Sequence, residues 1–279
     1  MRLDHLIAEK FSLTGNKSQQ LIRNGLIFVA GKQVLKPSFD VTWEEDIQMQ
    51  DDKSITWVSR SAGKLDGFLE QLSVHQYQFT MIKTRCLDIG SSTGGFTQIL
   101  LERGANHVDA VDVGTDQLHA SIRNDERVSV FEETDIRDFG REKEGRIGWS
   151  KKNIIPPLNG KIINNAHTSS FKNSPYDIIT IDVSFVSFIS LREIIPEVAR
   201  FADGHTHIFL LFKPQFEVGR TNLRKTWVPK NEKLIMDALY DFEDFLDHRG
   251  WRILSREKAT VIGEAGNQEW MMLVQIQTI

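Results

Sequence analysis

A chain of 279 residues, 40% hydrophobic and 26% charged with a net charge of −4, fits one or two globular domains and excludes a disordered or fibrous protein. The single cysteine, Cys86, excludes a disulfide framework, a multi-cysteine zinc site and a cysteine-held iron–sulfur cluster, and we expect no bound metal. The start of the chain does not resemble a signal peptide and no apolar run reaches about 18 residues, so we expect a cytoplasmic protein without stable membrane association.

The N-terminal residues predict a small α+β module. Apolar residues recur at helical spacing from Leu3 to Ile7, and Ser18–Gly25 is typical of a capped helix that ends at glycine. Two short strands follow, at Leu26–Val29 and Gln33–Leu35. The predicted order is therefore helix, helix, strand, turn, strand.

Charge is divided unevenly over this region. Residues 1–36 hold six Lys or Arg against two acidic residues, whereas residues 37–58 hold one Lys against six acidic residues. A net negative charge argues against a nucleic-acid partner only when the charge is spread evenly. A module with one basic face is compatible with RNA binding.

Three stretches resemble the S-four type RNA-binding module, namely Arg2-Leu3-Asp4, Ser18–Leu26 and Val29–Lys32. In that family, the helix that carries the Arg23 position and the turn after it face structured RNA. The resemblance implies RNA contacts from five basic residues: Arg2, Lys10, Lys17, Arg23 and Lys32. The alternative is a plain capping domain whose lysines are only solvated.

From Arg85 onward, apolar strands alternate with amphipathic helices, which predicts a parallel sheet covered on both faces. The candidate strands are Arg85–Ile89, His107–Asp112, Val128–Phe131, Asp177–Ile181, Thr206–Phe212, Trp251–Ser255 and Glu269–Gln275. The clearest helices are Phe96–Arg103, Phe188–Phe201 and Asn231–His248. The predicted organisation is a domain at 1–51, a linker at 52–60 and a second domain at 61–279.

Residues 140–175 interrupt this alternation. They contain a Pro-Pro pair, Asn-rich turns and little periodicity, which indicates an inserted loop. The loop is basic, with seven Lys or Arg against two Glu. A flexible insertion without function and an RNA-contacting loop are both compatible with this composition.

A glycine-rich turn follows the first strand of the second domain, within Cys86–Phe96. The dinucleotide-binding pattern Gly-x-Gly-x-x-Gly would need glycine at position 92, where this chain has serine. A dinucleotide-binding site is therefore not supported. The form Asp-x-Gly-x-Ser-x-Gly-Gly resembles motif I of S-adenosylmethionine methyltransferases. Its candidate cofactor-binding residues are Asp88, Gly90, Ser91, Gly94, Gly95 and Phe96.

Four of these residues have a specific expected role. Gly90 allows a sharp turn, while Gly94 and Gly95 let the methionine part of the cofactor lie against the main chain. We expect Asp88 to pair with the cofactor ammonium through water or backbone.

Two further acidic residues follow the next two strands. Asp112 comes 22 positions after Gly90, close to the ~20-residue spacing of a group that binds ribose hydroxyls. Asp135 is expected to accept a hydrogen bond from the adenine amino group. Alone, each acidic residue is more often a helix cap or a surface charge, but their order after the glycine turn favours a cofactor site.

The chain lacks features that two classes of methyl acceptor require, which limits the choice of acceptor. The Asn/Asp-Pro-Pro-aromatic turn common in amino-methylating enzymes is replaced here by Asp182-Val-Ser-Phe185. Methylation of cytosine carbon needs a reactive cysteine, and Cys86 lies within a strand, where a packed thiol is expected. A hydroxyl acceptor needs a group that orients or deprotonates it, and lysine can do so.

Two lysines are placed to act on such a hydroxyl. Lys213 follows an apolar strand and is expected at the ligand-binding edge of the sheet, and Lys64 opens the helix before the first strand. If their ammonium groups approach each other, repulsion favours loss of a proton from one, while Asp182 balances the charge. Glu269 could orient the second lysine or the ribose.

The whole chain resembles the TlyA-type haemolysin/ribosomal RNA 2′-O-methyltransferase family. The resemblance is carried by the segments 58–65, 87–96, 110–118, 134–137, 181–185, 212–220 and 266–269. It implies an α/β fold with a Rossmann-like, mostly parallel methyltransferase sheet whose last strand is antiparallel, joined to an S-four-like domain. It also implies a catalytic tetrad of Lys64, Asp182, Lys213 and Glu269, with Asp182 beside the S-adenosyl-L-methionine cofactor.

By the same resemblance, the substrate is a cytidine ribose of ribosomal RNA, with free RNA or ribosomal subunits as partners. Two departures from the family pattern are Ser61-Ala62-Gly63, in place of Gly-Gly-Leu before the first lysine, and the long loop at 140–175. The oligomeric state is left open.

RNA contacts are also expected from Arg60 and Arg220. Residues 213–233 carry six Lys or Arg against two Glu, so this segment, the first 36 residues and the loop at 140–175 are all basic. If the three lie on one side of the molecule, they form an RNA footprint that the net charge conceals.

Three alternatives stand beside ribose methylation. The family's haemolysin label suggests a membrane-active cytolysin, but the chain has no transmembrane span or long basic amphipathic helix. A non-catalytic RNA-binding assembly factor would not need the intact tetrad. Base methylation is the closest alternative among enzymes.

Overall fold

The computed structural model describes residues 1–50, 52–75, 77, 80–141, 175–183, 190–263 and 265–277. It divides into two compact units, Met1–Trp57 and Val58–Ile279. The division falls within the segment 52–60, which the sequence indicates as a linker. Most of the predicted loop at 140–175 lies outside the described residues.

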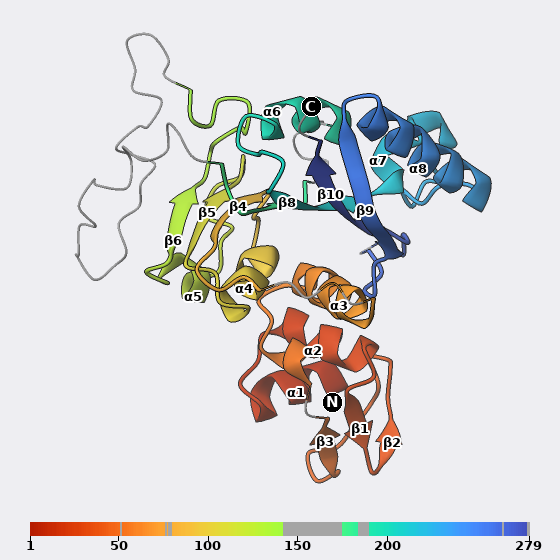
Figure 1. Ribbon diagram of the computed structural model, residues 1–279. Helices are drawn as coiled ribbons and strands as arrows, with labels where there is room; N and C mark the ends of the chain where they lie inside the picture. Colours follow the sequence, from red (N-terminus) through yellow and green to blue (C-terminus); the bar gives the residue numbers. More distant parts are fainter. Residues whose placement is uncertain are drawn as a thin grey trace. The chain divides into compact units, whose positions relative to one another are not determined.

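The first unit combines two helices with a small antiparallel sheet (Figure 1). The helices are α1 (Leu3–Lys10) and α2 (Gly15–Arg23), and the strands, in the sheet order β2-β1-β3, are β1 (Ile27–Val29), β2 (Lys32–Gln33) and β3 (Ile47–Met49). A short 3-10 helix, η1 (Lys53–Ile55), ends the unit. The predicted order of the first four elements is confirmed, and their apolar side chains form one core.

Two details of this unit differ from the prediction. Helix α2 begins before Ser18, because Thr14 is its N-cap and accepts a hydrogen bond from the Lys17 amide at 3.2 Å. Ser18 is buried inside the helix, and its hydroxyl donates to the Thr14 carbonyl at 3.1 Å. Strand β3 was not predicted, because only Ile47 of its three residues is buried and no alternation marks it.

The second unit contains a seven-stranded sheet in the order β6-β5-β4-β7-β8-β10-β9. Its strands are β4 (Arg85–Ile89), β5 (His107–Val111), β6 (Val128–Phe131), β7 (Ile178–Ile181), β8 (His207–Phe212), β9 (Trp251–Lys258) and β10 (Trp270–Ile276). Strand β10 runs antiparallel to both of its neighbours, and the pairs among β4 to β8 are parallel. The expected mostly parallel sheet with an antiparallel last strand is confirmed.

Helices cover both faces of this sheet, as predicted. Helices α3 (Ser61–Val74), α4 (Gly95–Glu102) and α5 (Ala120–Arg123) lie on one face, and α6 (Leu191–Val198) and α8 (Glu232–Asp247) on the other (Figure 1). The short α7 (Pro214–Glu217) and η4 (Arg220–Asn222) follow β8. Helix α6 is shorter than the predicted 188–201; Ser190 caps its start by accepting from the Arg192 amide at 3.0 Å.

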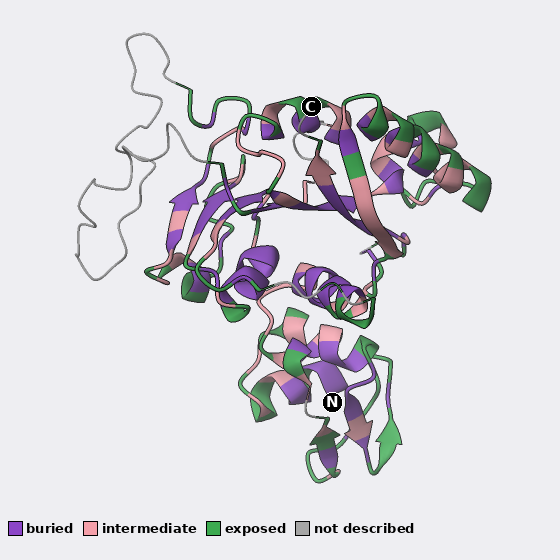
Figure 2. Cartoon of the chain, in the orientation of Figure 1, coloured by how far each residue is buried: buried purple, intermediate pink, exposed green. Residues whose placement is uncertain are grey.

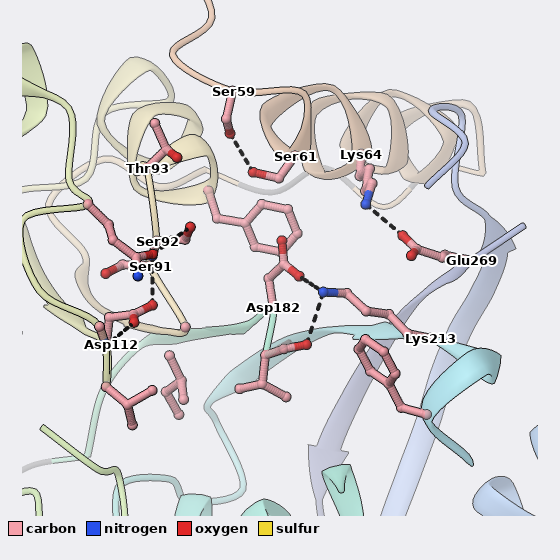
Figure 3. A pocket seen from close by; sticks show the side chains of 18 of the residues that line it. Ser59, Ser61, Lys64, Ser91, Ser92, Thr93, Asp112, Asp182, Lys213 and Glu269 are labelled. Atoms are coloured by element: carbon pink, nitrogen blue, oxygen red, sulfur yellow. Dashed lines mark hydrogen bonds and ion pairs between the residues drawn. The ribbon is translucent and has the colours of Figure 1, made fainter. Parts of the chain in front are cut away.

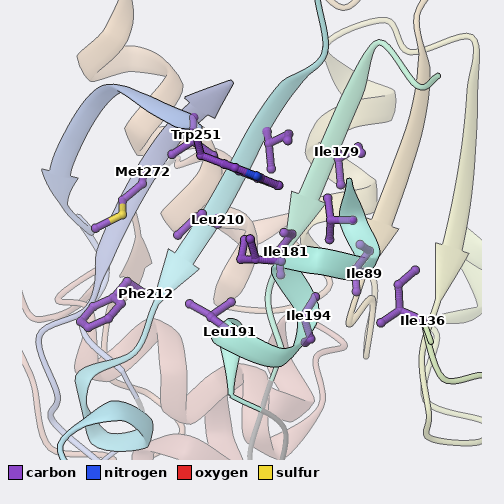
Figure 4. Close-up of a cluster of buried hydrophobic side chains, with 14 of the residues drawn as sticks. Ile89, Ile136, Ile179, Ile181, Leu191, Ile194, Leu210, Phe212, Trp251 and Met272 are labelled. Carbon is purple, nitrogen blue, oxygen red and sulfur yellow. The ribbon is translucent and has the colours of Figure 1, made fainter. Parts of the chain in front are cut away.

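Strands β4 to β8 and β10 are buried along most of their length (Figure 2), which explains why they read as continuous apolar runs. The edge strand β9 is the exception, because Trp251 is its only buried residue. One core cluster packs Ile181 and Leu210 of the sheet against Leu191 and Ile194 of α6 (Figure 4). No helix in the described part of the chain has the length and apolarity needed to cross a membrane.

Parallel strands bring distant parts of the chain to a common edge. The residues that follow β4, β7 and β8 are neighbours there, because β7 lies between β4 and β8. Gly90, Asp182 and Lys213 therefore meet at the carboxyl edge of the sheet, the edge at which such folds bind ligands.

Candidate active site

A cavity of about 480 Å³ opens at this edge of the sheet. Its volume lies in the range of small-molecule and cofactor sites. It is lined by most of the residues singled out from the sequence: Lys64, Gly90, Ser91, Phe96, Asp112, Asp135, Asp182, Lys213 and Glu269. Figure 3 shows how the labelled side chains converge from separate elements.

The glycine turn packs tightly against the end of β7. Gly90 has a φ of +81°, and a Cβ atom at this position would lie 2.6 Å from the Asp182 carbonyl oxygen. Only glycine combines this backbone conformation with this approach. Ser91 and Phe96, which follow in the turn, line the cavity.

Gly94 and Gly95 pack closely against neighbouring segments of the chain. Neither lines the cavity. Gly94 has a φ of +97° and lies against Leu118 and Ile122, and a Cβ atom on Gly95 would collide with the Ser59 and Ser61 hydroxyls. These glycines therefore allow chain segments to pack around the turn. The expected contact of their main chain with the methionine part of the cofactor stays a prediction.

Asp112 is fixed at the carboxyl end of β5. One carboxylate oxygen accepts a hydrogen bond from the Ser92 amide at 2.8 Å, and the other accepts from the Gly114 amide at 2.6 Å. Both bonds use backbone donors of the turns that line the cavity. The carboxylate is thereby held at the position where this fold places a ribose-binding group.

Asp135 also lines the cavity, but its carboxylate is engaged by a neighbour. Arg137 donates to it from Nε at 2.9 Å and from a terminal guanidinium nitrogen at 2.6 Å. A bidentate pair of this kind orients the carboxylate. Contact with an adenine amino group stays a prediction, and such a contact would have to share these oxygens.

Asp88 lies beneath the glycine turn and does not line the cavity. Its two carboxylate oxygens accept from the hydroxyls of Thr97, at 2.5 Å, and Thr180, at 2.7 Å. Burial raises the pKa of Asp88 to about 6. These bonds tie helix α4 to strands β4 and β7. The expected pairing of Asp88 with the cofactor ammonium, through water or backbone, stays a prediction.

Lys213 and Asp182 form one of two lysine–carboxylate ion pairs among the described residues that line the cavity (Figure 3). Lys213 Nζ lies 2.6 Å from Asp182 Oδ1 and donates to the Val183 carbonyl oxygen at 2.9 Å. Only 11% of the Lys213 side chain and 14% of the Asp182 side chain are exposed. The pair is therefore largely shielded from water, where its electrostatic interaction is stronger than at an open surface.

Lys64 and Glu269 form the second pair. Lys64 Nζ lies 2.6 Å from Glu269 Oε2, and both residues are buried. The other oxygen, Glu269 Oε1, accepts from Gln215 Nε2 at 2.9 Å. Gln215 also lines the cavity but was not singled out from the sequence. Its position two residues after Lys213 could have indicated it.

The departure from the family pattern before Lys64 is accommodated in the fold. The Ser59 and Ser61 hydroxyls bond each other at 2.7 Å and pack on Gly95, and the Gly63 carbonyl accepts from Thr260 Oγ1 at 3.0 Å. Helix α3 is thus held against the start of α4 and against the segment after β9. Lys64 of this helix lines the cavity.

The basic residues that are expected to contact RNA differ in their surroundings. Lys10, Arg23 and Lys32 are exposed, and Arg2 pairs with Asp4 at 2.6 Å. Arg60 lines the cavity in the second unit.

Lys17 is engaged within the first unit instead. Its Nζ donates to the carbonyls of Ser54, at 2.6 Å, and Trp57, at 2.9 Å, and burial lowers the pKa of its ammonium group. These bonds hold the segment after β3, and the expected contact of Lys17 with RNA stays a prediction. The single RNA footprint remains a prediction, since most of the loop at 140–175 is outside the described residues.

Comparisons with known proteins agree with this geometry. The family model of FtsJ-like methyltransferases matches residues 57–275, and that of the S4 domain matches residues 1–47. The 23S rRNA (cytidine-2′-O)-methyltransferase TlyA of Campylobacter jejuni is 36% identical to this chain over 289 aligned residues, 97% of each protein.

Two further similarities span nearly the whole chain. The 16S/23S rRNA (cytidine-2′-O)-methyltransferase TlyA of Mycobacterium tuberculosis is 31% identical over 98% of this chain and 88% of its own length. A solved structure from Streptococcus thermophilus, described as a hemolysin, superimposes with a TM-score of 0.65 at 26% identity, covering 99% of this chain and 88% of that one. The chain belongs to the FtsJ-like methyltransferases, in the TlyA-type family that joins this domain to an S4 domain.

Proposed function

We propose that this protein transfers a methyl group from S-adenosylmethionine to the 2′-hydroxyl of a cytidine in ribosomal RNA. The observation that carries the proposal is the meeting of two lysine–carboxylate pairs, Lys64–Glu269 and Lys213–Asp182, in one cavity with the glycine turn. The activity itself is the one named for the relatives from Campylobacter jejuni and Mycobacterium tuberculosis.

The residues around the glycine turn fit the cofactor. Gly90 lets the chain turn where a side chain would collide with Asp182, and the two backbone bonds of Asp112 hold its carboxylate at the cavity wall. Ser91, Phe96 and Asp135 line the same cavity. When bound there, S-adenosylmethionine would supply a methyl group on a positively charged sulfur, which is a good leaving group.

The two ion pairs would act on the RNA hydroxyl. Lys213, held by Asp182 and by the Val183 carbonyl, would orient the 2′-hydroxyl or take its proton. Lys64, held by Glu269, would orient the ribose from the other side. Positioning of two reactants in one shielded cavity supplies much of the acceleration in a reaction of this kind.

The S4 domain and the exposed basic residues support an RNA substrate. The proposal implies a cytoplasmic location, where ribosomal subunits or their RNA are available.

The test is a map of 2′-O-methylated nucleotides in ribosomal RNA from cells with and without the protein. The proposal predicts at least one cytidine whose ribose methylation is lost without the protein and is restored by the intact gene, but not by a Lys213→Ala variant. Identical maps from both kinds of cell would contradict it.

A further inference from the structure

Trp227 is a large aromatic residue that lines the cavity and still exposes 44% of its surface. It lies in the segment after β8, between η4 and α8. Its φ of +62° is in the left-handed region, which is unfavourable for a bulky side chain. Neither core packing nor backbone preference explains why tryptophan occupies this position.

A tight turn fixes the main chain at Trp227. The Trp227 amide donates to the Arg224 carbonyl at 3.0 Å, and the Arg224 amide donates to the Val228 carbonyl at 2.8 Å. The flanking residues Leu223 and Pro229 form an isolated antiparallel bridge. The ring is therefore presented by an internally bonded turn.

The turn is also attached to the segment that carries Glu269. Asn267 Nδ2 donates to the Trp227 carbonyl at 3.3 Å, and Asn267 precedes Glu269 by two residues. In the sheet order, β10 and β8 lie on the opposite side of β7 from β4, β5 and β6, whose ends carry the proposed cofactor residues. Trp227 thus belongs to the part of the cavity left for the methyl acceptor.

The chemistry around Trp227 suits a nucleotide. The Arg220 guanidinium lies 5.9 Å from the centre of the Trp227 ring, and both residues are exposed. Exposed cations in the same segment, at Arg224, Lys225 and Lys230, favour a phosphate backbone.

A buried hydrogen-bond acceptor lies beside Trp227. Asn267 is 3% exposed and lines the cavity, and its Oδ1 has no hydrogen-bond partner within the described residues. Buried polar atoms are usually paired, so this oxygen suits a donor brought by a ligand.

We propose that Trp227 is a stacking platform for the base of the RNA nucleotide that is methylated, with Arg220 beside it. The inference rests on the proposed function, because it assumes an RNA acceptor whose ribose enters the cavity. Enzymes that modify nucleotides commonly bind an unstacked base against an aromatic side chain. A flat ring at the cavity mouth would hold the base while the ribose reaches Lys213 and Lys64.

The test compares three variants of the full-length protein in methyl transfer from labelled S-adenosylmethionine to ribosomal subunits of cells that lack it. Trp227→Ala should lower kcat/KM for the subunits about 10-fold to 100-fold, the range for loss of one base–aromatic stack. Trp227→Phe should stay within about 5-fold of the wild type, because it keeps a flat ring. Calorimetry should give Trp227→Ala the wild-type affinity for S-adenosylmethionine.

Tyr240→Ala is the matched control. Tyr240 is 51% exposed, and the Arg256 guanidinium lies 5.8 Å from its ring centre, but it is on α8 and does not line the cavity. It should leave kcat/KM unchanged.

Wild-type activity in Trp227→Ala would overturn the inference, as would a loss of cofactor affinity that accounts for the loss of activity. A wild-type protein that transfers no methyl group would instead overturn the proposed function, and this inference with it.

Discussion

Lys64 and Glu269 are 205 residues apart in the chain, and their side chains form a buried ion pair with 2.6 Å between Nζ and Oε2. The pair joins helix α3, which precedes the sheet, to the start of β10, its last strand. Gln215 holds the second oxygen of Glu269, so the Lys64 ammonium is positioned by three separate segments. The cavity is therefore complete only when the whole second unit is folded.

Removal of one partner of this pair should cost both activity and stability. Lys64→Met leaves the Glu269 carboxylate buried without its cation, and we expect a loss of about 3–5 kcal/mol in the free energy of unfolding, measured by urea denaturation. Methyl transfer should be lost.

The double variant Lys64→Met/Glu269→Gln separates the two effects. It removes both charges, so most of the stability should return while activity stays absent. Methyl transfer by the folded double variant would show that Lys64 has no part in the reaction.

Asp88 should make stability depend on pH. Burial raises its pKa from 3.8 to about 6, so its contribution to stability is full below pH 4 and is lost as the pH rises through 6. Asp88→Asn removes this titration. The unfolding free energy of the variant relative to the wild type should therefore rise by about 2–3 kcal/mol between pH 4 and pH 8. The same difference at both pH values would contradict the assigned cause.

Cys86 tests the alternative of cysteine-dependent base methylation. The thiol is buried in β4, and burial raises its pKa to about 12, so the nucleophilic thiolate is scarce at neutral pH. Cys86→Ala should keep methyl transfer within about 2-fold and lose about 1 kcal/mol of stability. The native thiol should react with a thiol reagent only after unfolding. An inactive but folded variant would favour base methylation.

The sheet could be predicted closely because its strands are apolar runs between turns. Strands β4 and β6 have the predicted bounds, and the order of helices and strands in the second unit follows the alternation of the sequence. The positions of Asp112, Asp182 and Lys213 on the cavity wall follow from the rule that ligands bind at the carboxyl ends of parallel strands.

The direction of individual side chains could not be predicted in the same way. Strand β4 is buried on both faces, so no polar alternation shows that Asp88 points toward Thr97 instead of the cavity. Lys17 has the sequence context of an RNA-binding residue. Only the folded chain shows that its ammonium group donates hydrogen bonds to the Ser54 and Trp57 carbonyls. Trp227 lies in an irregular turn, where periodicity carries no information.

In the proposed reaction, Lys213 orients the RNA 2′-hydroxyl or takes its proton. The direct measurement is transfer of a labelled methyl group from S-adenosylmethionine to ribosomal subunits by the purified protein, followed by digestion of the RNA to nucleosides. We predict that the label appears in 2′-O-methylcytidine. Lys213→Ala and Asp182→Ala should each abolish this product, while calorimetry still detects cofactor binding.

Label found in a methylated base would contradict ribose methylation, and full activity in both variants would contradict the role of the Lys213–Asp182 pair.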